Sequence, residues 1–109
     1  YLIAKMYYEQ KEYETTEQLC REAVKKSSSY PIWVARTLLL LSDVYIAEED
    51  LFNAKAAVDA ILENFNSDEE IVEDAREQRR RIERLEAKNS RIREESGDSL
   101  LDLRENRNN

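Results

Sequence analysis

The sequence contains no histidine and one cysteine, Cys20, among its 109 residues. Without histidine the usual pairs of nucleophile and base cannot be assembled, and a lone cysteine excludes an internal disulfide. Cys20 stands at helical spacing from Ala23 and Val24, which predicts a small buried side chain rather than a reactive thiol. We therefore expect a protein that catalyses no reaction and needs no cofactor.

Glycine and proline are equally scarce, with one of each in the chain. These two residues mark turns, so the chain has few tight turns to build. Strict alternation of β-branched and polar residues, which is typical of strands, is not seen. The sequence therefore predicts an all-α fold of helices joined by short polar links.

The formal net charge is −7. An acidic surface repels nucleic-acid phosphates and anionic lipid headgroups, so both are poor partners. The longest wholly aliphatic run covers residues 38–41, far short of the roughly 20 residues that span a bilayer. We expect no nucleic-acid partner and no membrane insertion.

Apolar residues recurring at three and four positions predict five helices. Four of them cover residues 1–9, 12–26, 31–47 and 51–62, and the fifth begins near residue 67. The third has the most continuous apolar content and should be the most buried.

Local signals mark where these helices begin and end. Pro31 suits the first turn of the third helix, and Asp50 can cap the fourth. Ser67 followed by Glu70 has the spacing of a capping box and predicts the start of the fifth helix. Gly97 is expected to end it.

Shifting the chain by 38 residues onto itself aligns small or apolar residues in both helices of a hairpin. The aligned pairs are Ala4 and Ser42, Tyr7 and Tyr45, Tyr13 and Leu51, Thr16 and Ala54, Cys20 and Val58, Ala23 and Ile61, and Val24 and Leu62. Agreement over two helices and the turn between them indicates an internal repeat. Because one hairpin cannot bury its apolar face alone, such repeats are stable when stacked.

This pattern resembles the tetratricopeptide repeat. The second copy carries it best, with Leu38, Leu41, Ser42, Tyr45, Leu51, Ala54, Val58, Ile61 and Leu62. In that family the small residues, here Ser42 and Ala54, let two helices approach closely, and Tyr45 fills the space beside them. The 38-residue spacing exceeds the usual 34, and the usual tryptophan, glycine and closing proline are not all in place. The pattern is similar to the longer, divergent repeats of bacterial envelope and assembly proteins.

The resemblance implies an α-solenoid of two antiparallel helix hairpins with a long C-terminal capping helix. Its predicted parts are hairpin 1 (residues 1–30, truncated at its start), hairpin 2 (31–66), the capping helix (67–96) and a polar, flexible tail (97–109). The first helix is too apolar for a free outer face, so we expect earlier repeats before Tyr1. We also expect this piece to self-associate through its N-terminal face.

The resemblance further implies that a protein or peptide partner binds the concave face, formed by the first helix of each hairpin. Carried over by position, that face presents Tyr1, Lys5, Tyr8, Glu9, Arg36, Leu39, Asp43 and Ile46. Exposed tyrosine and leucine beside charges suit a docked peptide or helix. Repeats of this family that bind a terminal carboxylate use lysine and asparagine. Here Lys5 is present but Asp43 stands at the asparagine position, which argues against that ligand. The alternative is that these residues only cover the neighbouring helix.

The fifth helix carries a heptad seam, in which residues at alternating steps of four and three are mostly apolar. Its members are Ile71, Ala75, Gln78, Ile82, Leu85, Asn89 and Ile92. One interpretation is a dimeric coiled coil, and the other is that residues 71–85 pack back on the fourth helix. We favour the second, because Ala75 and Gln78 weaken the seam. An oligomerising end cap that uses Ile71, Ala75, Ile82, Leu85 and Ile92 is the alternative function.

Two charged clusters on the fifth helix have plain structural explanations. The acidic residues are Asp68, Glu69, Glu70, Glu73 and Asp74, and the basic ones are Arg76, Arg79, Arg80, Arg81 and Arg84. Acidic residues are favoured in a first helical turn, and the glycine-kinked loop of a calcium site is missing. Pairs such as Glu77 with Arg81 predict a charge-laced exposed helix rather than a nucleic-acid site. The sequence therefore predicts a non-catalytic protein-interaction or assembly scaffold without a metal.

Overall fold

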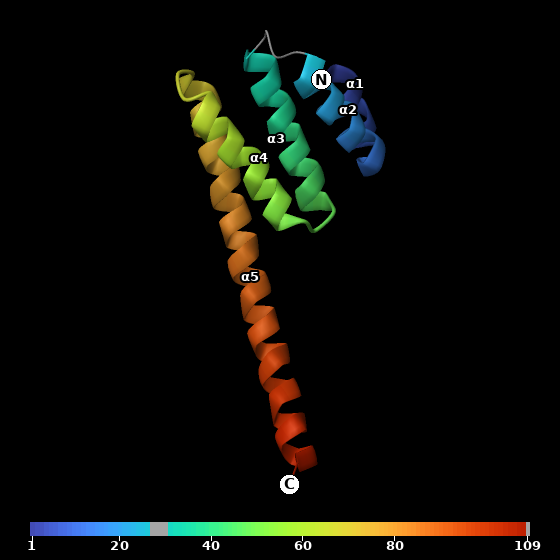
Figure 1. The fold of residues 1–109 in the computed structure, drawn as a ribbon, viewed down its shortest axis with the longest axis vertical. Coiled ribbons are helices and arrows are strands. Elements are labelled where there is room, and N and C mark those ends of the chain that lie inside the picture. Colours follow the sequence, from blue (N-terminus) through green and yellow to red (C-terminus); the bar gives the residue numbers. More distant parts are fainter. Residues whose placement is uncertain (27–30, 109) are drawn as a thin grey trace.

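The computed structural model describes the backbone of residues 1–26 and 31–108 and the side chains of residues 1–26 and 31–94. Five helices account for nearly all of this backbone, and no strand occurs in it, so the all-α prediction is confirmed. They are α1 (Leu2–Glu9), α2 (Tyr13–Lys26), α3 (Pro31–Ala47), α4 (Leu51–Asn64) and α5 (Glu69–Asn108). Figure 1 shows α5 running along the body made by α1–α4 and then far beyond it, which gives extents of 64 × 29 × 20 Å.

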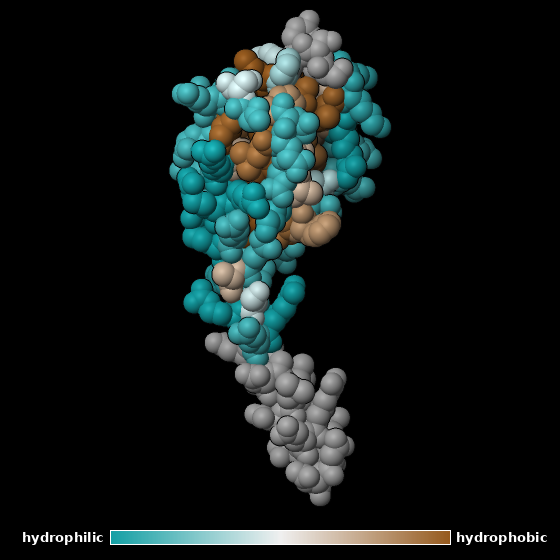
Figure 2. All heavy atoms as spheres, turned by 60° about the vertical axis from the view of Figure 1, so that its left-hand side comes forward, coloured by the Kyte–Doolittle hydropathy of each residue, from teal (hydrophilic) through white to brown (hydrophobic). Residues whose placement is uncertain are grey.

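The helices pack mainly in chain order. α1 lies on α2, α2 on α3, α3 on α4 and α4 on α5, and α3 also reaches α5. Helices that follow one another along the chain are antiparallel (Figure 1). Hydrophobic residues gather in the packed body, and the described part of the projecting α5 is mostly hydrophilic (Figure 2).

The helix bounds repeat with a period of 38 residues. α1 ends at Glu9 and α3 at Ala47, which lies 38 residues later. α2 and α4 keep the same offset at both of their ends, and so do the starts of α3 and α5. The periodicity found in the side chains is therefore also present in the backbone.

The turns inside the two hairpins are built alike. Lys11 and Glu49, which are 38 residues apart, both adopt φ of 62°. The hydrogen bonds around them match: Lys11 N to Tyr8 O at 2.9 Å, Glu49 N to Ile46 O at 3.0 Å, Glu12 N to Tyr7 O at 3.0 Å, and Asp50 N to Tyr45 O at 2.8 Å. This is the Schellman pattern that ends a helix, here with a charged residue where glycine is usual.

α3 is the most buried helix, as predicted. Its buried residues are Val34, Ala35, Thr37, Leu40, Leu41, Ser42, Val44 and Tyr45. The Ser42 hydroxyl donates to the Ala54 carbonyl oxygen at 2.9 Å, so two small residues meet where α3 and α4 approach. Cys20 is buried, also as predicted, and burial raises the pKa of its thiol to about 11.

Two predictions about α5 are wrong. Asp68, not Ser67, caps the helix, because its carboxylate accepts from the Ile71 amide at 3.1 Å. The helix also continues through Gly97 to Asn108 instead of giving way to a tail. One glycine costs a helix only about 1 kcal/mol relative to alanine, and the good helix formers Glu94, Glu95, Leu100 and Leu101 flank this stretch. Asn109 lies outside the described residues.

Candidate binding groove

Seven of the eight residues predicted for the concave face line one open groove of about 370 Å³. They are Tyr1, Lys5, Tyr8, Glu9, Arg36, Leu39 and Asp43, and the groove also includes Leu40, Ile71 and Asp74. The walls come from α1, α3 and α5, which are equivalent helices in the 38-residue period. Ile46 does not line this groove and is half-buried against the core.

Helical spacing explains why these side chains share a face. Tyr1, Lys5 and Tyr8 are four and three residues apart, and Arg36, Leu39 and Asp43 are three and four apart, so each set lies along one side of its helix. The third wall of the groove, supplied by α5, could not be anticipated from the positions predicted for the concave face. Ile71 belonged to the predicted heptad seam, and Asp74 to the acidic first turns of α5.

Aromatic pairs hold Tyr1, which precedes α1, and Tyr8 of α1 in place. The Tyr1 ring lies 5.7 Å from the Trp33 ring, and the Tyr8 ring lies 5.8 Å from the Tyr13 ring, both in tilted arrangements. Such pairs add about 0.5–1.5 kcal/mol beyond the area that they bury. The tyrosines are about 10 Å apart along the helix, which fixes two aromatic contacts along the groove.

A polar network ties α3 to α5 beside the groove. Gln78 Nε2 donates to Asp43 Oδ1 at 2.7 Å and to Ser42 Oγ at 3.3 Å. Arg81 Nη1 lies 3.6 Å from the same carboxylate oxygen. Ser42 in turn donates to Ala54 of α4, so the network crosses three helices. In the sequence Gln78 was visible only as a polar residue that interrupts an apolar seam.

The network determines the electrostatics of the groove. Burial raises the pKa of the Asp43 carboxyl above its usual value, although the hydrogen bond from Gln78 and the charge of Arg81 lower it. Burial is also the largest cause that raises the pKa of Tyr8, and the charges of the nearby Asp43 and Tyr13 raise it further. Tyr8 therefore keeps its hydroxyl proton at neutral pH and can both donate and accept.

Most of the heptad seam is used within the chain. Ile71, Ala75 and Ile82 are buried, and Leu85 is half-buried. A 3.5 Å ion pair between Lys55 and Glu86 joins α4 to α5 near the end of this stretch. The first part of the seam therefore packs on the chain's own helices, and among the apolar residues of the seam Ile92, 52% exposed, is the one left open to a second chain.

The charged clusters of α5 show their structural roles. Asp68 caps the helix, and the described residues contain no group of three or more side chains placed to hold a metal ion. Arg79 pairs with Glu83 and Arg80 with Glu73. Arg81 was expected to pair with Glu77 and instead pairs with Asp43.

Neither the helices nor known proteins identify a function directly. No helix in the described part of the chain combines the length and apolarity needed to cross a membrane. The chain matches no known protein family, no curated protein and no solved structure.

Proposed function

We propose that this chain is a non-catalytic protein-interaction module that binds a peptide or a helix of a partner protein along the groove. The observation that carries the proposal is the groove itself, in which seven side chains chosen by position on α1 and α3 face one another and α5 adds a third wall. A cleft shared by successive hairpins is an extended concave surface of the kind that helical repeat proteins use.

A tetratricopeptide-like solenoid is the architecture that we propose. The 38-residue period of helix bounds, the matching turns and packing in chain order support it. The close contact of Ser42 with Ala54 supports it too, because small residues at those positions are the feature on which the resemblance rests.

The composition of the groove suits a peptide. Tyr1, Tyr8 and Leu39 offer aromatic and aliphatic contacts, and the exposed Lys5 and Arg36 offer charge. Aromatic residues and arginine are the side chains that most often dominate binding energy at interfaces. Asp43 is engaged by Gln78 and Arg81, and its negative charge disfavours a ligand that presents a terminal carboxylate.

The chemistry of the side chains supports a role without catalysis. The chain has no histidine, and the one thiol has a pKa raised to about 11 by burial, so it stays protonated at neutral pH. A protonated, buried thiol is not a nucleophile.

The test is selection of binders from a phage-displayed library of random peptides, followed by affinity measurements with groove variants. Arg36→Glu and Lys5→Glu reverse charges on exposed groove residues, and Lys25→Glu is the matched control on an exposed site of α2 outside the groove. We expect the groove variants to weaken binding of the selected peptides at least about 10-fold, and the control to leave it unchanged.

Circular dichroism of each variant checks that the fold is retained. Peptides that bind the wild type and both groove variants equally well would show that the site lies elsewhere and would contradict the proposal.

An oligomerising end cap is the second candidate, favoured by the exposed Ile92 on a helix that runs on to Asn108. Ile92→Asp tests it, because Ile82 is buried and its replacement would disturb the fold. An oligomer seen by light scattering that Ile92→Asp dissociates would support this role, and a wild-type monomer would contradict it.

A further inference from the structure

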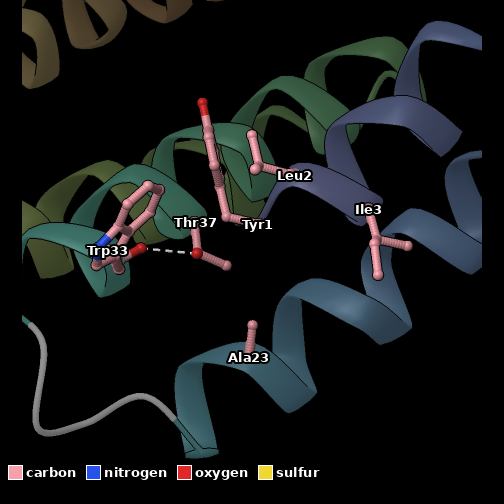
Figure 3. Close-up of a pocket in the computed structure, with 6 residues that line it drawn as sticks. All are labelled: Tyr1, Leu2, Ile3, Ala23, Trp33 and Thr37. Atoms are coloured by element: carbon pink, nitrogen blue, oxygen red, sulfur yellow. Dashed lines mark hydrogen bonds between the residues drawn. The ribbon is translucent and has the colours of Figure 1, made fainter.

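The outer face of α1 is strongly apolar and open. Leu2, Ile3 and Met6 are 72%, 64% and 49% exposed. Beside them lies a hollow of about 400 Å³, lined by Tyr1, Leu2, Ile3, Ala23, Trp33 and Thr37. In Figure 3 the side chains of Ala23 and Thr37 point into the space between α1, α2 and α3.

The 38-residue period shows what these positions look like when they are covered. The counterparts of Leu2, Ile3 and Met6 are Leu40, Leu41 and Val44, which are 6%, 8% and 0% exposed. The hollow has counterparts as well: Ala23, Trp33 and Thr37 correspond to Ile61, Ile71 and Ala75, all buried. Leu2, Ile3 and Met6 are thus exposed on α1 at positions that are buried on α3, whereas Thr37, which lines the hollow, is itself buried.

Two parts of the structure make that difference. α2 lies against α3, whereas among the described residues no helix of this kind lies on the outer face of α1. Residues 31–38 of α3 also precede the counterpart of Tyr1, and Val34, Ala35 and Thr37 of this stretch are buried. α1 has no such preceding turns within the chain, and the hollow lies beside its first residues.

We propose that the open face of α1 docks one further helix hairpin of this same 38-residue repeat, whose second helix covers α1 as α2 covers α3. This role is independent of the peptide groove. It continues an interface that the structure already contains twice, between α2 and α3 and between α4 and α5.

A polar contact predicts the character of the docked helix. The Tyr45 hydroxyl accepts from Arg21 Nη2 at 2.6 Å and donates to Glu17 Oε1 at 3.1 Å. Tyr7 is the counterpart of Tyr45 and is half-buried. A helix that covers α1 in the same way therefore carries glutamate and arginine four residues apart, facing Tyr7.

A second copy of the chain fits this face less well. The helices equivalent to the docked one are α2 and α4, and they are already covered by α3 and α5. A second copy could bring its own α1 face, which offers apolar side chains but no glutamate and arginine pair for Tyr7. The need for a glutamate and arginine pair beside Tyr7 therefore favours a further hairpin over a second copy of this chain.

The test is to add a copy of residues 1–38 directly before Tyr1 of the full chain. The copy supplies helical turns like those before the counterpart of Tyr1 and a covering helix like α2, in the observed register. We expect the amides of α1 to exchange with deuterium at least about 10-fold more slowly, and the midpoint of urea denaturation to rise.

Two controls separate docking from a mere increase in length. An extension with Glu17→Ala and Arg21→Ala in the added copy should protect α1 less than the unaltered one. A short extension that repeats only residues 27–38 should slow amide exchange in α1 and raise the urea midpoint much less than the full copy, because it lacks the covering helix.

Three results would overturn the proposal. One is unchanged exchange in α1 with the full extension. Another is an added copy that contributes no helical signal, because a docked hairpin must be folded. The third is a dimer of the unextended chain that Leu2→Lys dissociates, which would make a second copy the occupant. A monomer by light scattering agrees with the proposal and contradicts the self-association expected from the sequence.

Discussion

The two hairpins, α1 with α2 and α3 with α4, have the same plan and different surroundings. Their helices end at equivalent residues, and their turns use the same hydrogen bonds around Lys11 and Glu49. Hairpin 2 lies between α2 and α5, whereas in the part of the chain that the structure describes hairpin 1 has a neighbouring helix on one side only. Burial in this molecule therefore depends on position in the row as much as on the local sequence.

Equivalent residues have diverged with those surroundings. Asp43 takes part in the polar network with Gln78, whereas its counterpart Lys5 is exposed on the groove. Ile61 fills the core where its counterpart Ala23 lines a hollow. Paired substitutions at equivalent positions can measure how much the neighbours contribute.

The largest difference is expected at Ile61 and Ala23. Ile61→Ala should lower the free energy of unfolding by about 2–5 kcal/mol, because it removes a fully buried side chain. Ala23→Ile should leave stability within about 1 kcal/mol of the wild type, since the hollow has room for it. Urea denaturation followed by circular dichroism measures both. A loss at Ala23→Ile as large as that at Ile61→Ala would mean that the hollow is not open in solution.

A smaller difference is expected for the two tyrosines. Tyr45→Phe removes the hydroxyl that joins Arg21 and Glu17, and should cost about 1 kcal/mol, given that Arg21 is largely exposed. Tyr7→Phe should change the free energy of unfolding by less than about 0.5 kcal/mol in the chain as it is. Equal losses of stability in Tyr45→Phe and Tyr7→Phe would contradict the conclusion that α2 covers Tyr45 while no helix covers Tyr7 in this way. In the extended chain we expect the cost of Tyr7→Phe to rise toward that of Tyr45→Phe.

The turns should respond alike. Lys11→Gly and Glu49→Gly place glycine at φ of 62°, where a side chain is disfavoured, and each should raise the free energy of unfolding by up to about 1 kcal/mol. Thermal denaturation of the two single variants and the double variant checks equality and additivity. A gain at one turn and a loss at the other would contradict their structural equivalence.

The smallest effect concerns pH. The folded pKa of Asp43 is raised above its usual 3.8, so the folded state holds this proton more tightly than the unfolded state. This carboxyl therefore makes stability fall as pH rises from about 3.8 through the raised value. Asp43→Asn keeps an acceptor for Gln78 and removes that titration, so the variant should lack this part of the decline.

Urea denaturation at a series of pH values, expressed as wild type minus variant, isolates the contribution of Asp43. Lys5→Gln at the equivalent, exposed site is the control, because it changes the charge there by one without removing a carboxyl. A difference curve for Asp43→Asn that is flat, or that slopes the other way, would contradict the burial of this carboxyl.

Much of the fold and of the candidate groove could be predicted, because helical periodicity is a local property. Pro31 begins α3 and Asp50 caps α4, its side chain accepting from the Asn53 amide at 3.1 Å, as the sequence indicated. The positions carried over from the tetratricopeptide resemblance also include seven residues that share one groove. The end of α5 was not predicted, since one glycine is a weak stop signal when no proline follows.

The sequence by itself determined the class of the fold, the 38-residue period and the face of each helix that turns inward, since all three follow from the order of side chains along the chain. Only the tertiary structure decided that Gln78 joins Asp43, that α5 supplies the third wall of the groove, and that Leu2 is open while Leu40 is covered. The physical reason is that these features depend on which helix lies alongside. Residues far apart in sequence meet only once the helices have packed.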